Sequence, residues 1–215
     1  MDLNFEIDES EVFRMLGARG KENDSIKALV CQAIKSVTEN AVPRAVYRKV
    51  EREALRPLLL GHDIETHLKK CDSVVALACT LGSEIDRLIR SLQISDMALA
   101  VVVDAAASVA IESVAESLEK GIRKQLEEQG LFLTGRFSPG YGDYTISVQN
   151  GLVSFLDAQR RIGLQVTDSH LLIPRKSITA LCGVSRHRVK GKLAGCEHCV
   201  LRETCTRRKE GKVCD

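Results

Sequence analysis

Hydrophobic residues recur at three- and four-residue spacing in three stretches of the chain, a pattern typical of helices with one buried face. The first stretch begins beside the N-cap candidates Asp24 and Ser25 and ends before Pro43, and the second opens at Ser83. The third predicts a long helix from about residue 96 to residue 129. Its inward stripe consists of Val103, Ala107, Ile111, Val114, Leu118, Ile122 and Leu126.

The pattern is different between the first two helices. Residues 73–79 form a compact apolar run, which predicts a buried strand. A short helix is expected after Asp63, and residues 45–53 are compatible with either a strand or a helix. This part of the chain therefore contributes at least one strand to a sheet.

The last third of the chain predicts one helix followed by a hairpin. The helix covers residues 147–162, with Gly163 placed to cap its C-terminus. Two strands, 164–173 and 177–184, are expected to pair through the turn at Pro174. Long helices in the first half and a helix with a hairpin in the second indicate an α+β fold, with an antiparallel sheet and long flanking helices.

Length and composition limit the organisation and location of the protein. A chain of 215 residues fits one domain with a short appendage, which we place at 1–185 and 186–215. The acidic first residues do not resemble a secretory signal. The longest apolar stretch, 98–110, is interrupted by Asp104 and is too short to cross a bilayer. We therefore expect a cytoplasmic protein without a membrane partner.

Basic residues are concentrated in the segment 186–215. It carries nine Lys or Arg against four acidic residues, although the net charge of the whole chain is only +2. Such a tail favours contact with an acidic partner, either a protein, a phosphate or a nucleic acid. A solvated basic surface is an equally good explanation.

The same tail holds four of the eight cysteines, Cys196, Cys199, Cys205 and Cys214. A Cys-x-x-Cys pair places two thiolates within reach of one metal, and two more complete a four-ligand shell. The spacing leaves an iron–sulfur cluster, zinc and unmetallated thiols open as alternatives. The other four cysteines lie in apolar surroundings in the sequence and are expected to be buried: Cys31, Cys71, Cys79 and Cys182.

A glycine-rich turn, 136–143, offers the second candidate for chemistry. Pro139 fixes one backbone angle, while Gly140 allows conformations that other residues resist. Such a loop presents backbone polar groups to a ligand, Arg136 offers a bidentate partner for a carboxylate, and Tyr141 offers a flat ring. A plain β-turn with an incidental arginine gives the same pattern.

These residues occur in an order that resembles a known family. The R-x-x-P-G-Y turn at 136–141 is followed by a helix, by the Thr-Asp-Ser segment at 167–169 and by the Pro-containing segment up to 180. This order is similar to the activation domain of cobalamin-dependent methionine synthase. The long helix before the turn is similar too, and the resemblance covers roughly residues 100–185.

The resemblance implies a binding site for S-adenosylmethionine. Arg136, Pro139, Gly140 and Tyr141 would form the binding turn, and Glu112 matches a helix carboxylate that contacts the ligand in the family. A solvated polar stripe along the helix also accounts for Glu112. The chain departs from the family pattern in having no acid at 130–135, where a ligand-binding Glu is expected.

The implied role is that of an accessory part of a methionine synthase system. The family restores oxidised cob(II)alamin by one-electron reduction coupled to methylation from S-adenosylmethionine, and it contributes proximity rather than acid–base catalysis. Cobalamin would be carried by a separate methionine synthase or another corrinoid protein chain, with an electron donor. An iron–sulfur cluster in the tail would suit the electron transfer.

A non-catalytic alternative is a zinc-stabilised basic protein that contacts nucleic acid or a protein partner. The absence of aromatic residues from the tail argues against base stacking and thus against nucleic acid. Three histidines are assigned no ligand role. His62 and His67 are interpreted as surface residues, and His170, in an Asp-x-His sequence, as part of a strand rather than of a corrinoid site.

Overall fold

The structure is a computed structural model that describes residues 3–18 and 23–189. Its contacts cluster into two compact units, each built from three segments of the chain. Among the described residues, the first unit comprises 3–18, 23–46, 78–122 and 153–178, and the second comprises 47–77, 123–152 and 179–189. The segment 186–215, predicted as a separate tail, lies mostly outside the described residues, so its boundary stays a prediction.

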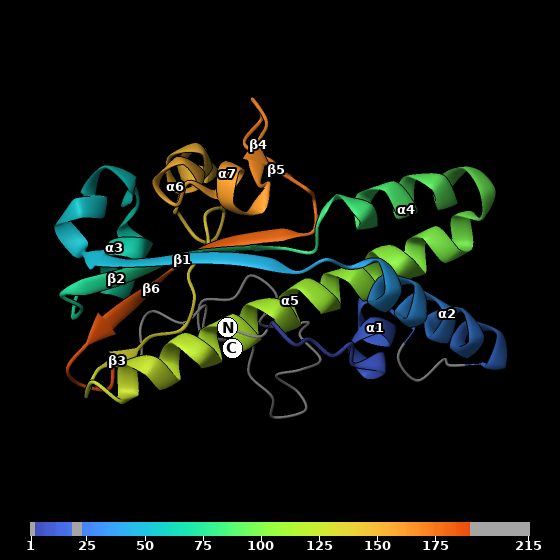
Figure 1. Cartoon of the computed structure of the whole chain (residues 1–215), viewed down its shortest axis with the longest axis horizontal. Helices are drawn as coiled ribbons and strands as arrows, with labels where there is room; N and C mark the ends of the chain where they lie inside the picture. Colours follow the sequence, from blue (N-terminus) through green and yellow to red (C-terminus); the bar gives the residue numbers. More distant parts are fainter. Residues whose placement is uncertain (1–2, 19–22, 190–215) are drawn as a thin grey trace. The chain divides into compact units, whose positions relative to one another are not determined.

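Helices and strands are interspersed along the chain (Figure 1). The helices are α1 (Glu9–Met15), α2 (Asp24–Asn40), α3 (His62–Leu68), α4 (Ser83–Ser95), α5 (Met97–Glu127), α6 (Gln149–Phe155) and α7 (Ala158–Ile162), with two 3-10 helices, η1 (Arg52–Leu58) and η2 (Ile146–Val148). The strands are β1 (Arg44–Glu51), β2 (Ser73–Thr80), β3 (Phe132–Leu133), β4 (Gln165–Val166), β5 (Leu172–Ile173) and β6 (Ser177–Ser185).

A four-stranded sheet has the order β1-β2-β6-β3, and β4 and β5 form a separate two-stranded sheet. Strands β3 and β6 pair antiparallel, with Phe132 opposite Ser185. The start of β1 lies beside the end of β2, because Val42 donates its N–H to the carbonyl of Leu81, so this pair is antiparallel as well. The predicted α+β class is therefore confirmed, and the ambiguous stretch 45–53 forms most of β1.

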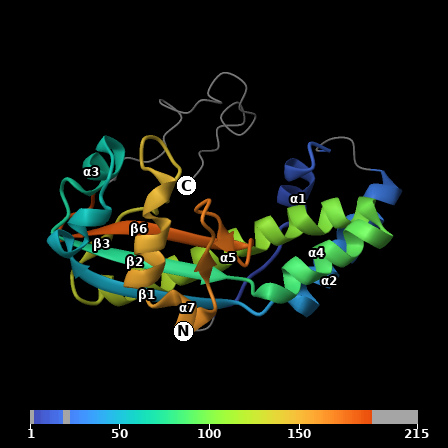
Figure 2. The same ribbon diagram turned by 90° about the horizontal axis from the view of Figure 1, so that it is seen from above.

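Four helical segments make up most of the first unit. In Figures 1 and 2, α1, α2 and α4 gather around the N-terminal part of α5. The predicted inward stripe of α5 is buried at every position. Helix α2 is capped by Asn23, one residue before the predicted cap, and its side chain accepts the N–H of Ile26. Cys31 on this helix is exposed, so the expectation that it is buried was wrong.

Helix α5 is longer than the apolar stretch that the sequence suggested. By length and composition alone its 31 residues would cross a bilayer, but 56% of the most apolar window is buried inside the protein. A core helix passes the same test. Its first residues are held by Asp96, whose carboxylate accepts the N–H of Leu99.

The helix predicted for residues 147–162 is interrupted. Residue Asp157 adopts the left-handed conformation (φ 52°) between α6 and α7, and its N–H bonds to the carbonyl of Ser154. Leu156, in the turn between the two helices, and Ala158, the first residue of α7, are both buried on either side of the break. Gly163 ends α7 with φ 73°, as predicted. Tertiary packing thus overrides a continuous helical pattern here.

The predicted pairing of 164–173 with 177–184 was wrong. Residues 165–166 instead pair with 172–173, as β4 and β5, around a turn in which Thr167 donates its N–H to the carbonyl of Leu171. His170 lies in this turn with φ 63° rather than in a strand. Polar residues at 167–170 close this tight hairpin, which leaves β6 free to join the four-stranded sheet.

The core of the second unit lies around the four-stranded sheet, with α3 and the C-terminal end of α5 beside it. The end of α5 is held to β1 by the Tyr47 hydroxyl, which donates to Oε1 of Gln125 at 2.8 Å. Cys71 and Cys182 are buried as predicted, and burial raises the pKa of the Cys71 thiol. These two thiols are parts of the apolar packing.

Candidate functional site

The glycine-rich turn 136–143 follows β3 and is tied to the sheet at its first residues. Phe137 and Leu181 of β6 exchange backbone hydrogen bonds of 2.9 Å in both directions. Within the turn, Gly140 donates its N–H to the carbonyl of Tyr144 at 2.8 Å, and Tyr144 donates to the carbonyl of Tyr141 at 3.0 Å. The turn is therefore a hydrogen-bonded loop with a defined backbone course.

The candidate ligand-binding residues of the turn differ in their exposure to solvent. Tyr141 is 58% exposed, whereas Arg136 is half-buried and Pro139 is buried. Gly140 has φ 93°, a conformation that residues with a side chain rarely adopt, so this position requires glycine. The outcome is a rigid loop with an accessible aromatic ring at its tip.

Aromatic side chains in and next to the turn pack against one another and against a histidine of α3. The ring centroids of His67 and Phe137 lie 5.2 Å apart, and those of Phe137 and Tyr144 lie 6.1 Å apart. His67 is 1% exposed, so its interpretation as a surface residue was wrong, while His62 is exposed as expected. The spacing along α3 could have separated the two histidines, because His67 follows the buried Ile64 by three residues and His62 does not share this spacing.

Thr134 connects α3, β6 and the turn. Its hydroxyl oxygen accepts the N–H of Gly183 at 2.8 Å and lies 3.0 Å from Nε2 of His67. The same ring nitrogen is 3.1 Å from the carbonyl oxygen of Gly135, next to Arg136. Buried polar groups are thus paired at the residues just before the turn, and these pairs fix where the turn begins.

The hydroxyl of Tyr144 is different, because it has no hydrogen-bond partner among the described residues. The side chain is 1% exposed, and burial raises the pKa of its phenol well above the ordinary value. A buried hydroxyl without a partner destabilises the fold by about 1–3 kcal/mol. Tyr144 therefore contributes through its ring.

Asp143, at the end of the turn, caps helix α3. Its Oδ2 accepts the N–H of His62 at 2.8 Å and its Oδ1 accepts the N–H of Asp63 at 2.9 Å. Helix α3 has no side-chain cap of its own, since its N-cap residue is Gly61. No local signal in the sequence shows that Asp143 caps a helix 80 residues earlier.

Glu112 is located on α5 in the first unit, where its side chain is exposed. The four turn residues belong to the second unit, so the structure brings Arg136, Pro139, Gly140 and Tyr141 together but describes Glu112 separately. Glu116, one helical turn further on, is also exposed. The assignment of Glu112 to a ligand stays a prediction.

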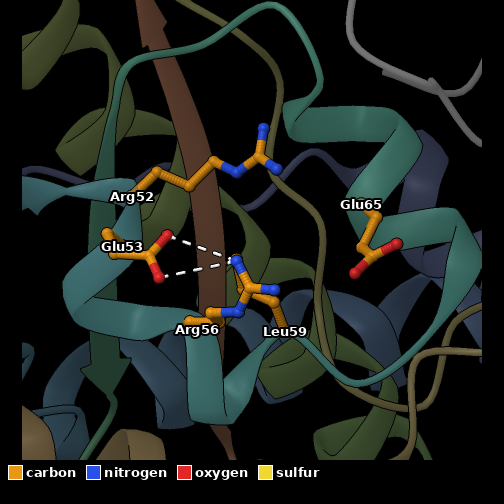
Figure 3. A pocket seen from close by; sticks show the side chains of 5 residues that line it. All are labelled: Arg52, Glu53, Arg56, Leu59 and Glu65. Carbon is orange, nitrogen blue, oxygen red and sulfur yellow. Dashed lines mark hydrogen bonds and ion pairs between the residues drawn. The ribbon is translucent and has the colours of Figure 1, made fainter.

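Hollows in the described part of the chain include two that lie away from the turn. One, of about 140 Å³, is lined by Arg52, Glu53, Arg56, Leu59 and Glu65 (Figure 3). Arg56 is paired with Glu53 there, at 3.5 Å, and both side chains are highly exposed. The other, in the first unit, lies beside the ion pair of Lys176 and Asp104. Glu112 and the four turn residues line neither of these hollows.

The four cysteines predicted to bind metal, Cys196, Cys199, Cys205 and Cys214, lie outside the described residues. Within 3–18 and 23–189, no group of three or more His, Cys, Asp or Glu side chains is placed to hold a metal ion. The iron–sulfur and zinc alternatives of the tail stay predictions.

Comparison with known proteins assigns the family. The family described as "Vitamin B12 dependent methionine synthase, activation domain" matches residues 5–188. The chain belongs to this activation-domain family. The match extends the resemblance, which the sequence carried over roughly residues 100–185, to almost the whole described chain.

Activation-domain proteins are also represented among solved structures. A crystal structure of the MetH reactivation domain bound to AdoHcy is similar, with a TM-score of 0.48 and 20% sequence identity. The similarity covers 66% of this chain and 47% of that chain, so this chain spans about half the length of the solved relative. No curated protein matches the sequence.

Proposed function

We propose that this protein binds S-adenosylmethionine at the turn 136–141 and assists the reductive methylation of cob(II)alamin on a separate corrinoid protein. The observation that carries the proposal is the family match over residues 5–188, which includes the whole turn. The solved relative that was crystallised with AdoHcy supports a ligand of this class. Cobalamin, the corrinoid partner, the electron donor and a cytoplasmic location belong to the proposal.

The residues of the turn suit the chemistry of the ligand. The Arg136 guanidinium would pair with the carboxylate of the methionine part, and the backbone carbonyl groups of Pro139 and Gly140 would accept hydrogen bonds from the ligand. The exposed ring of Tyr141 offers an apolar face beside the reacting methyl group. Glu112 would supply a negative charge for the cationic ligand.

The chemistry requires position rather than proton transfer. S-adenosylmethionine supplies an electrophilic methyl group, which traps the corrinoid once one electron has reduced it. The turn would hold this methyl group in line with the partner's cobalt, and the gain would come from proximity and orientation. The hydrogen bonds that fix the turn to β6 suit this task, because they limit its movement.

Calorimetric titration with S-adenosylmethionine tests the proposal. The wild-type protein should bind, and Arg136→Ala should weaken binding by at least about tenfold, since a charge-assisted bidentate contact is worth roughly 1.5–3 kcal/mol. Arg56→Ala is the matched control in the same unit, because Arg56 is exposed, forms an ion pair with Glu53 and lies outside the proposed site. Absence of binding to the wild-type protein would remove the proposed function.

A further inference from the structure

We propose that Asp143 is a positioning residue for the proposed ligand-binding turn, and that it acts by anchoring the turn to the N-terminus of helix α3. This inference rests on the proposed function, in which residues 136–141 hold S-adenosylmethionine. It adds a residue outside the binding motif: Asp143 follows Tyr141 in the sequence, whereas Arg136 precedes it.

The anchor is built from both sides. The Asp143 carboxylate accepts the backbone N–H groups of His62 and Asp63 at 2.8 and 2.9 Å. In the other direction, the backbone N–H of Asp143 donates to Oδ2 of Asp63 at 3.4 Å. A negative carboxylate at a helix N-terminus satisfies two donors that otherwise lack partners, and it also interacts favourably with the helix dipole.

The steric fit of the two segments is close. A Cβ atom at Gly61 would lie 2.8 Å from both the carbonyl oxygen and Oδ1 of Asp143. A Cβ atom at Gly142 would lie 2.1 Å from Oδ2 of Asp63. Glycine at both positions therefore permits the approach, which indicates that the contact depends on residue choices in two distant segments.

The Asp143 contact is one of two attachment points of the turn, and its loss would affect ligand binding. The turn is fixed at its start by the Phe137–Leu181 backbone pair and at its end by Asp143, and Tyr141 lies exposed between these two points. Release of the Asp143 contact would leave the end of the turn to be held by the buried Tyr144, with fewer restraints on the position of Tyr141. The ligand would then have to order the turn on binding, which reduces its affinity.

The experiment compares S-adenosylmethionine affinity by calorimetry in wild type, Asp143→Ala, Asp143→Asn and Asp96→Ala. Asp143→Ala should bind about tenfold more weakly, because the ordering of the turn then opposes binding. Asp143→Asn keeps an oxygen acceptor and should recover most of the affinity. Asp96→Ala removes an aspartate cap of the same kind from α5, so it controls for lost stability and should bind like the wild type.

Amide exchange of His62 and Asp63 on the same samples reports whether the anchor has opened. Faster exchange in Asp143→Ala together with unchanged affinity would overturn the positioning role and leave the proposed function intact. An equal loss of affinity in Asp96→Ala would also overturn it, because the effect would then follow stability alone. Lack of binding by the wild type would overturn both proposals, and a folded Asp143→Asn provides the comparison if Asp143→Ala does not fold.

Discussion

Asp143 completes the N-terminus of helix α3 at Asp63, a residue 80 positions earlier in the chain. The two aspartates exchange hydrogen bonds through their backbone N–H groups, so each carboxylate has a donor from the other segment. The two acidic side chains can lie close together because each carboxylate accepts a backbone N–H group. This exchange also joins the exposed turn to the folded part of the second unit.

The first prediction concerns the fit at Gly142. Gly142→Ala should cost about 1 kcal/mol more in unfolding free energy than Gly130→Ala, because the new Cβ atom displaces the Asp63 carboxylate and weakens the anchor. Gly130 is a matched control, since it also has a positive φ (71° against 56°) but has open space around it. Urea unfolding measures both costs.

A double-mutant cycle separates contact from backbone strain. In an Asp63→Ala background the clash is absent, so the two glycine replacements should cost the same. An excess cost at Gly142 that persists in that background would show that the contact with Asp63 is not its cause.

The second prediction concerns Glu112. Glu112→Gln should weaken S-adenosylmethionine binding several-fold, because it removes a charge that would attract the sulfonium and ammonium groups. Glu116→Gln is the control, since Glu116 is also exposed and lies on the same helix. Calorimetry at low and high salt measures both variants. Equal affinities for the two would assign Glu112 to the solvated polar stripe of α5.

The third prediction concerns Tyr144 and alkaline pH. Burial raises the pKa of this phenol above its value of about 10 in the unfolded chain, so the unfolded chain loses its proton first as the pH rises. The contribution of Tyr144 to stability is therefore complete below about pH 10 and is lost above it, with a slope of up to about 1.4 kcal/mol per pH unit.

Tyr144→Phe should remove this slope, and at neutral pH it should leave the protein equally stable or about 1 kcal/mol more stable, because a buried hydroxyl without a partner disappears. Tyr141→Phe, at an exposed position, is the control and should change neither value. Chemical unfolding between pH 7 and pH 11 measures the effect. A marked loss of stability in Tyr144→Phe at neutral pH would mean that the hydroxyl has a partner.

The fourth prediction concerns the cysteines of the tail. If Cys196, Cys199, Cys205 and Cys214 hold a metal, Cys199→Ser should remove most of it, since a four-ligand site loses one thiolate. Cys31→Ser is the control, because Cys31 is exposed and lies on α2. Iron, zinc and sulfide are measured after anaerobic purification. Full metal content in Cys199→Ser would place the metal elsewhere, and iron with sulfide would favour an electron-transfer role.

Local patterns in the sequence were sufficient for the elements that carry their own periodicity. The inward stripe of α5 and the apolar run of β2 are buried as predicted, because burial of one face follows directly from residue spacing. The turn 136–143 was found from its proline and glycines, which restrict or permit backbone angles whatever surrounds them. The order of these segments was also sufficient to recognise the family, which the family match confirms.

Contacts between distant segments decided the features that the sequence did not predict. The helical pattern at 147–162 does not reveal the break at Asp157, and the strand pattern at 164–173 does not reveal that it folds back on itself. His67 is buried and His62 is exposed on one short helix, because only His67 meets Thr134 and Phe137. The sequence by itself determined the elements that carry their own periodicity and the course of the turn 136–143, because their causes are local. Only the tertiary structure decided how that turn is held, because the hydrogen bonds of Asp143 and Thr134 join residues that come together after the chain has folded.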